Sequence, residues 1–134
     1  MSDGETMSTP PAGDWPVAVI DDNQGVRTAL CNLLDSAGYR SCSFAAGEQF
    51  LRSDCLPAAS CAIVDLDLTC MSGFDLAEQL AQLRPELPVI LMSARDNALQ
   101  RQRASELGAA ALLFKPFDAD TLLAQLRAII AAPG

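Results

Sequence analysis

Carboxylate, hydroxyl and ammonium side chains follow separate apolar runs of this sequence. Asp21 and Asp22 come directly after the first run, and Asp65 comes after a later one. Ser93 and Lys115 end two further runs nearer the C-terminus. Carboxylates can bind a hard divalent cation, and one of them can act as a nucleophile toward phosphorus. The residue types therefore indicate phosphoryl chemistry, provided that the fold brings these runs together.

Apolar runs alternate along the chain with segments of helical periodicity. The runs predict buried strands, and segments whose apolar residues recur every three or four positions predict amphipathic helices. Asn23, Ser72 and Asp118 are expected to cap helices, and Gly38 is expected to end the first one. The predicted strands are residues 15–20, 39–44, 61–64, 89–92 and 110–114, and the predicted helices are 23–38, 48–52, 74–83, 97–107 and one that starts after residue 118.

Five alternations of strand and helix predict an α/β fold with a parallel sheet. Fully apolar strands between amphipathic helices imply that helices cover both faces of the sheet, which makes a three-layer sandwich. Right-handed crossovers place the carboxyl ends of all the strands at one edge, where open α/β sheets bind ligands. Five polar side chains would then meet at this edge, namely Asp21, Asp22, Asp65, Ser93 and Lys115.

Three neighbouring carboxylates repel one another, and Mg²⁺ is the expected partner because it prefers oxygen and usually takes a few carboxylates plus waters. Phosphoryl transfer depends mostly on positioning and on charge neutralisation. In this arrangement Asp65 would be the nucleophile that forms an aspartyl phosphate. Lys115 would neutralise one phosphoryl oxygen, and Ser93 would donate a hydrogen bond to another.

Composition limits the classes of protein that fit. The chain has 134 residues, half of them apolar, a net charge of −8 and no histidine, so we expect one globular domain over residues 15–132. Residues 1–14 are polar and are expected to be a disordered extension without signal-peptide character. The acidic charge argues against binding of nucleic acid by this domain, and no apolar run reaches the roughly 18 residues of a membrane span. We therefore expect a cytoplasmic protein.

The five cysteines are scattered, and no C-x-x-C motif or histidine is present to complete a zinc site. Reduced thiols are the expected state. Cys61 begins the strand that carries Asp65 and is expected in the core, whereas Cys70 is expected in an exposed loop.

Taken together, these residues resemble the receiver domain of two-component response regulators, the CheY-like family. The resemblance covers nearly all of residues 15–132, and five motifs in order carry it: Asp21-Asp22, Asp65, Met71-Ser72-Gly73, Ser93-Ala94 and Lys115-Pro116-Phe117. It implies a flavodoxin-like (βα)5 fold with strand order 2-1-3-4-5.

The same resemblance implies specific roles. Asp65 would be the phosphoacceptor, while Asp21, Asp22 and the backbone carbonyl of Asp67 would join it in holding Mg²⁺. Ser93 would be the switch hydroxyl, and Lys115 would bind phosphate. A histidine kinase or a phosphotransfer protein would supply the phosphoryl group, and the chain would catalyse only its own phosphorylation and dephosphorylation.

Two residues depart from the family pattern. Many receivers have proline where this chain has Thr69, and the switch aromatic three residues before the lysine is Leu112 here.

Asp67 and Arg95 stand at two positions that tune hydrolysis of the acyl phosphate in receivers. Their opposite charges are expected to pair over the phosphate and obstruct water.

The implied output surface comprises the fourth helix, the fifth strand and the fifth helix, and it is also a candidate homodimer face. Phosphorylation would add roughly −1.5 to −2 charges at the sheet edge. The fourth helix has the poorest apolar stripe, because Arg101 and Arg103 interrupt it, so it is expected to shift most readily.

Taken singly, each of these residues has an ordinary explanation: Asp22 as a helix-start acid, Ser93 as a loop residue and Lys115 as a solvated charge. An enzyme is the main alternative for the set. Residues 65–69 also fit the D-x-D-x-T signature of haloacid-dehalogenase-type phosphatases, in which Asp65 would be the nucleophile and Asp67 the acid/base. Those enzymes place their metal-binding acid pair late in the chain, whereas Asp21 and Asp22 come early. A metal-binding adaptor that is never phosphorylated is a third alternative.

Overall fold

The computed structural model describes residues 15–69 and 71–130, which form alternating strands and helices. The expected disordered extension over residues 1–14 and the expected loop position of Cys70 lie outside this description. In chain order the elements are β1 (Val17–Ile20), α2 (Gln24–Ser36), β2 (Ser41–Phe44), α3 (Gly47–Leu51), α4 (Cys55–Ala58), β3 (Cys61–Asp65), α5 (Gly73–Leu83), β4 (Val89–Ser93), α6 (Ala98–Glu106), β5 (Ala111–Phe114) and α7 (Ala119–Ile129).

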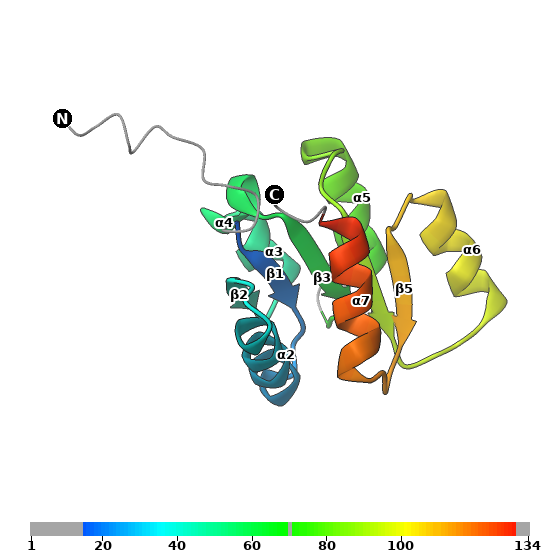
Figure 1. The fold of residues 1–134 in the computed structure, drawn as a ribbon. Coiled ribbons are helices and arrows are strands. Elements are labelled where there is room, and N and C mark those ends of the chain that lie inside the picture. The colour runs from blue at the N-terminus through cyan, green and yellow to red at the C-terminus, as the bar shows by residue number, and fades with distance from the viewer. Residues whose placement is uncertain (1–14, 70, 131–134) are drawn as a thin grey trace.

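The five strands form one parallel sheet in the order β2-β1-β3-β4-β5 (Figure 1). This confirms the predicted flavodoxin-like α/β fold and its strand order. Ile20 pairs with Val64, and Asp65 pairs with Met92. Ser93 pairs with Phe114 at the end of the last strand pair. The register therefore brings the strand ends that carry polar residues to one edge of the sheet.

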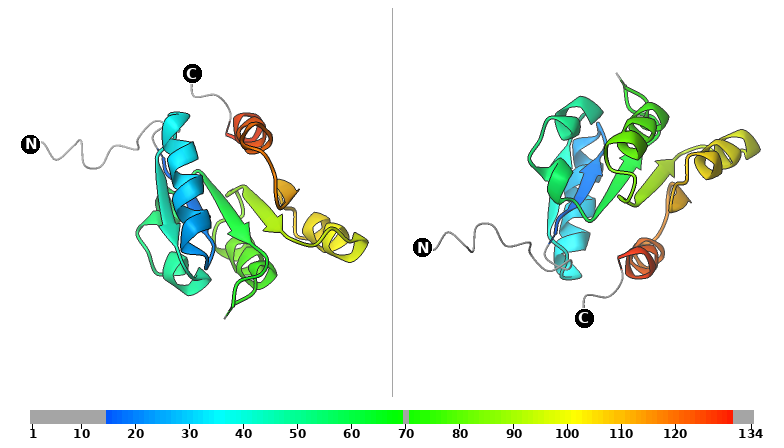
Figure 2. Two further views of the ribbon diagram at one scale, coloured as in Figure 1. Left: turned by 90° about the horizontal axis from the view of Figure 1, so that it is seen from below. Right: turned by 90° about the horizontal axis from the view of Figure 1, so that it is seen from above.

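Side chains alternate between the two faces of the sheet and build a separate apolar core on each face. Val17 and Val19 pack with residues of α2 and α7, whereas Ala18 and Ile20 pack with residues of α3, α5 and α6. Figure 2 shows α2 and α7 on one side of the sheet and α3 and α5 on the other. The central strands are buried on both faces, which explains their continuous apolar sequences.

The helix ends follow the polar residues that the sequence places there. Asn23, Ser72 and Asp118 are N-caps as predicted, and each accepts a hydrogen bond from the backbone N–H three residues later. Asn97 does the same for α6. Gly38, which follows α2, has φ of +90°, a conformation that favours glycine. Local capping thus sets the boundaries that point each strand–helix loop toward the sheet edge.

The one-turn helix α4 and a disulfide were not predicted. Pro57 lies inside α4, but the backbone N–H groups of a single turn have no intrahelical acceptor, so proline removes no helical hydrogen bond there. Cys55 on α4 forms a disulfide with Cys42 on β2, across a separation of 13 residues. The expectation of reduced thiols is therefore wrong for this pair, because the fold brings together two cysteines that no sequence motif connects. Cys61 is buried, as expected.

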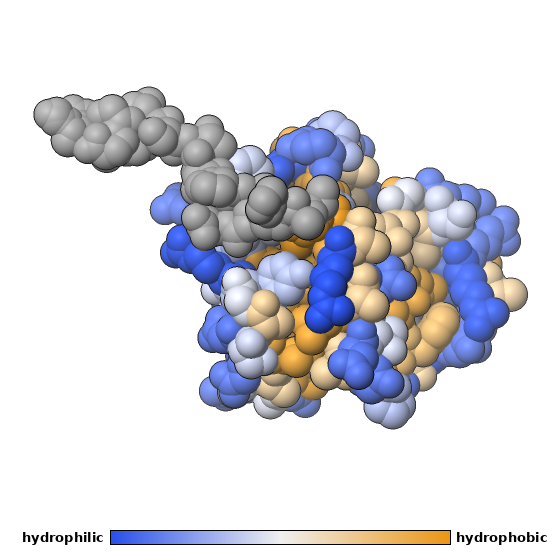
Figure 3. All heavy atoms as spheres, viewed as in Figure 1, coloured by the Kyte–Doolittle hydropathy of each residue, from blue (hydrophilic) through white to orange (hydrophobic). Residues whose placement is uncertain are grey.

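The surface is mixed in character. Apolar side chains gather between α2 and α7 and beside β5, with hydrophilic residues around them (Figure 3). A hollow between α2 and the segment that follows β5 is lined in part by Val26, Lys115 and Phe117. Among the described residues, no helix combines the length and the apolar character needed to cross a bilayer.

Candidate functional site

Three carboxylates meet at the carboxyl edge of the sheet, as predicted. One oxygen from each of Asp21, Asp22 and Asp65 lies within 4.8 Å of the other two. Asp21 and Asp65 are buried, whereas Asp22 is exposed. The cluster is therefore closed toward the core and open toward solvent, which leaves room for a small ligand to approach from outside.

Lys115 reaches the same cluster from β5. Its Nζ donates a hydrogen bond to Asp21 Oδ2 at 3.1 Å and lies 3.5 Å from Asp65 Oδ2. The backbone N–H of Lys115 donates to the Ser93 carbonyl oxygen at 2.8 Å, so β4 anchors the residue before its side chain extends. The Lys115–Pro116 peptide bond is cis. One ammonium thus neutralises part of the charge of two buried carboxylates, and the predicted convergence of Lys115 and Asp65 is confirmed.

The backbone around Asp65 holds its carboxylate in a fixed orientation. Asp65 Oδ1 accepts a hydrogen bond from the backbone N–H of Asp67 at 3.1 Å. Gly73, the first residue of α5, lies so close that a Cβ there would stand 2.5 Å from the Asp65 carbonyl oxygen and 2.6 Å from Leu66 Cα. Glycine at position 73 is therefore required for α5 to begin directly behind the Asp65 loop.

Burial, repulsion and attraction all act on Asp65. Desolvation raises the pKa of the Asp65 carboxyl above its ordinary value of 3.8, the Asp67 N–H opposes that rise, the negative charge of Asp21 adds to it, and Lys115 again opposes it. For Lys115, desolvation opposes the charged form, yet the Asp21 and Asp65 carboxylates raise the pKa of the ammonium overall. Lys115 therefore keeps its proton, and the Asp65 carboxyl ionises less readily in the folded protein than it would in water.

Ser93 ends β4 on the strand next to β3, and its side chain is fully buried. Its Oγ accepts a hydrogen bond from the Arg95 backbone N–H at 2.9 Å. The hydroxyl has two acceptors within reach, Gln100 Oε1 at 2.8 Å and the Arg95 carbonyl oxygen at 3.0 Å. The structure thus places Ser93 at the end of the strand that neighbours the Asp65 strand, with its proton directed to residues of its own loop and of α6.

The predicted tuning and switch residues lie around this edge. The side chains of Asp67 and Arg95 are exposed, and no ion pair joins them among the residues described. Leu112 on β5 is half-buried and lines an open hollow with Arg101 and Phe114.

Two site residues escaped the sequence reasoning. Arg27 donates from Nη1 to the Asp21 carbonyl oxygen at 2.8 Å and so fixes the loop of the acid pair. Gln100 contacts Ser93 from the first turn of α6. Arg27 could have been suspected from its place one turn into the helix that follows Asp21 and Asp22. No signal marked Gln100, because α6 has no apolar stripe that would orient its faces.

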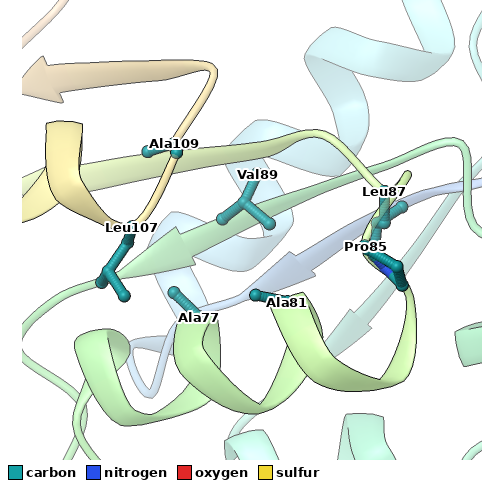
Figure 4. A pocket seen from close by; sticks show the side chains of 8 residues that line it. Ala77, Ala81, Pro85, Leu87, Val89, Leu107 and Ala109 are labelled. Atoms are coloured by element: carbon teal, nitrogen blue, oxygen red, sulfur yellow. The ribbon is translucent and has the colours of Figure 1, made fainter.

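A small pocket of about 50 Å³, lined by apolar side chains, lies at the opposite edge of the sheet. Its walls include Ala77 and Ala81 of α5, Val89 at the start of β4, and Leu107 and Ala109 after α6 (Figure 4). Loops that lead from a helix into a strand form this edge, away from the acid cluster. The pocket contains no titratable side chain, so we assign it no chemistry.

Comparisons with known proteins agree with this geometry. The family model described as response regulator receiver domain matches residues 17–127. Response regulator protein TmoT of Ectopseudomonas mendocina is 32% identical over 111 residues, which is 83% of this chain and 50% of TmoT. Transcriptional regulatory protein FixJ of Azorhizobium caulinodans is 33% identical over 113 residues, 84% of this chain and 54% of FixJ. The chain thus spans about half the length of the curated relatives it matches.

Solved structures give the same result. The BeF3-activated DrrB receiver domain superposes with a TM-score of 0.80 at 27% identity and covers 87% of this chain and 97% of its own. The non-phosphorylated HemR receiver domain from Leptospira biflexa gives 0.77 at 29% identity, over 87% and 94%. Response regulator StyR gives 0.79 at 31% identity, over 88% and 60%.

We predict that Gly73→Ala disturbs the Asp65 loop and destabilises the protein. The new methyl group would overlap backbone atoms that cannot rotate away, and overpacking of this kind costs about 1–3 kcal/mol. Denaturant unfolding measures the loss. Gly47→Ala is the matched control: Gly47 also begins a helix and is buried, but its added Cβ would stand 3.2–3.3 Å from flexible side chains of Met71 and Leu76. Equal losses in the two variants would contradict the proposed close approach at Gly73.

We also predict that Asp65→Asn is more stable than the unmodified protein at neutral pH in metal-free buffer. Because folding raises the pKa of Asp65 above 3.8, the native state favours the neutral carboxyl, and this contribution is lost as the pH rises through the folded pKa. The advantage of the variant should therefore shrink as the pH falls toward 3.8. Thermal melts across this range measure the effect. Asp54→Asn is the control, because Asp54 is exposed, makes no side-chain capping hydrogen bond and is not among the groups that shift the pKa of Asp65. A variant less stable than the unmodified protein at neutral pH would refute this reading.

Proposed function

This chain belongs to the response regulator receiver domain family, whose members act in two-component signal transduction, and on that premise we propose that Asp65 accepts the phosphoryl group. The observation that carries the proposal is the pocket itself. A buried carboxylate stands 3.5 Å from Lys115 Nζ and beside two further carboxylates. We also propose residues 15–132 as the receiver domain and 1–14 as its disordered extension.

The proposed reaction is a displacement at phosphorus. An oxygen of Asp65 attacks the phosphorus of a phosphohistidine on a histidine kinase or phosphotransfer protein. The new O–P bond forms as the N–P bond breaks, and the electron pair stays on the imidazole nitrogen of the donor. Hydrolysis later returns the carboxylate and releases inorganic phosphate. The chain would catalyse these two steps on itself and act on no other substrate.

The donor set fits Mg²⁺, the cation that receiver domains bind at their acidic cluster. The three carboxylates supply hard oxygen ligands, and the exposed Asp22 leaves coordination positions for water and a phosphoryl oxygen. Asp21, Asp22, Asp65 and the backbone carbonyl of Asp67 would hold the ion. When bound, it would supply positive charge close to the phosphoryl oxygens.

Residues of the chain itself would complete the phosphoryl site. Lys115 already carries its proton between Asp21 and Asp65, so it can move from a carboxylate to a phosphoryl oxygen without changing protonation. Ser93 would turn its hydroxyl to another phosphoryl oxygen. The change would then pass to the surface formed by α6, β5 and α7, with Leu112 in the place of an aromatic ring. A homodimer through this surface remains a prediction, which sedimentation with and without a phosphate mimic tests.

We place the domain in the cytoplasm, where histidine kinases deliver phosphoryl groups, and we propose no binding to nucleic acid or membrane by this acidic domain. The phosphatase alternative is not supported. The acid pair that meets Asp65 lies at the end of β1, and the comparisons match receiver domains over most of the chain.

Incubation with acetyl phosphate and Mg²⁺, followed by intact-mass measurement, tests the proposal. We expect the unmodified chain to gain the mass of one phosphoryl group and Asp65→Asn to gain none, because the amide lacks the nucleophilic oxygen. Chelation of Mg²⁺ should abolish the gain. If Asp65→Asn also gained this mass, the phosphoacceptor would be a residue other than Asp65. Failure with both acetyl phosphate and a phosphorylated phosphotransfer protein would favour the unphosphorylated adaptor, and turnover of a phosphomonoester would favour the enzyme.

We further propose that Asp67 and Arg95 pair across the phosphoryl group and slow the attack of water. Arg95→Ala should then shorten the lifetime of the acyl phosphate by about two- to fivefold, the range expected for one exposed ion pair. Loss of phosphoprotein after removal of the donor measures this lifetime. Arg52→Ala is the control, because Arg52 is exposed at the end of α3 and lies at the other edge of the sheet. An unchanged lifetime in Arg95→Ala would rule out the pairing.

A further inference from the structure

The buried hydroxyl of Ser93 is tied to a helix. Gln100 Oε1 lies 2.8 Å from Ser93 Oγ, closer than the Arg95 carbonyl oxygen at 3.0 Å, and a hydroxyl has only one proton to donate. The remaining polar contact of Oγ is the hydrogen bond that it accepts from the Arg95 N–H. Ser93 is therefore fully satisfied before any phosphoryl group arrives.

Gln100 belongs to a helix that buries few of its side chains. Ala104 is the one buried residue of α6, and Leu99 beside Gln100 is 75% exposed. Gln100 lies in the first turn, where its own backbone N–H is capped by Asn97. Its side chain thus links the end of β4 directly to the first turn of the most weakly packed long helix.

We propose that Gln100 is a positioning residue, which holds the Ser93 hydroxyl away from the phosphoryl site and releases it when Asp65 is phosphorylated. The proposal deepens the function proposed above and depends on it. A hydroxyl that donates to a phosphoryl oxygen cannot also donate to Gln100, so the Ser93–Gln100 hydrogen bond must break. The first turn of α6 then loses a side-chain contact to the sheet. The two hydrogen bonds compete for one proton, which couples the site to the helix.

The proposal predicts the direction in which replacing Gln100 changes the affinity for a phosphate mimic. Removing the Gln100 acceptor stabilises the phosphorylated state relative to the unphosphorylated one, because the contact exists only before phosphorylation. The Arg95 carbonyl can still accept the hydroxyl proton, so the gain is smaller than that of a whole hydrogen bond. We expect Gln100→Met to bind beryllofluoride with Mg²⁺ about two- to fivefold more tightly than the unmodified chain. Methionine keeps the length and helix propensity of glutamine but has no amide.

Calorimetric titration of the full chain with beryllofluoride and Mg²⁺ measures this change. Gln102→Met is the matched control: Gln102 lies on the same helix, is exposed and contacts Glu106, and its replacement should leave the affinity unchanged. A merely structural loosening of α6 would act whether or not Ser93 is present. Gln100→Met should therefore have no effect in the Ser93→Ala background, and Gln100→Ala provides a second variant that lacks the acceptor.

Amide exchange over residues 98–106 gives an independent readout. Beryllofluoride should lower protection of the first turn in the unmodified chain, and Gln100→Met should show low protection already without it. Unchanged or weaker binding by Gln100→Met, or a gain that persists without Ser93, would overturn the role of Gln100. Beryllofluoride binding that does not depend on Asp65, tested with Asp65→Asn, would instead overturn the proposed function, so the two failures are distinguishable.

Discussion

Electrostatic repulsion among three carboxylates is the constraint on which the site depends. Their oxygens lie within 4.8 Å of one another, and two of the three side chains are buried. Like charges at such distances repel by about 4 kcal/mol per pair at an effective dielectric constant of 20. The fold supplies one ammonium, from Lys115, and two backbone N–H donors, from Asn23 to Asp21 and from Asp67 to Asp65. The balance remains negative, so the pocket is suited to a cation with a phosphoryl group.

The strand order explains why each side chain has its type. β3, which carries Asp65, lies between β1 with its acid pair and β4 with Ser93. Lys115 follows β5, two strands away from β3, and reaches both Asp21 and Asp65 past the end of β4. The long, flexible cationic side chain of lysine can span that distance. The placement of acid, hydroxyl and amine is therefore a consequence of a single parallel register.

Most of the fold and the centre of the site were predictable from local patterns. Continuous apolar runs ending in Asp21, Asp65 and Ser93 predicted the buried strands and the shared edge, because parallel crossovers allow no other placement of the strand ends. The predictions failed where only the folded chain brings residues together. The helix around Pro57 is a single turn without periodicity, and the Cys42–Cys55 pair has no sequence motif. The contact of Gln100 with Ser93 could likewise not be predicted, because no apolar stripe orients the faces of α6.

The polar packing of α6 connects the chemistry of the site to its surface. Arg101 lies over the ring of Phe114 at 5.3 Å, and Arg103 lies over the ring of Phe74 at 4.4 Å. Each such contact contributes about 0.5–1 kcal/mol at an exposed site, less than the roughly 1.5–3 kcal/mol of one buried leucine. A helix attached mainly by contacts of this size can move without opening the core. The arginines that give α6 its poor apolar stripe thus also make it suited to the responsive role that we propose for it.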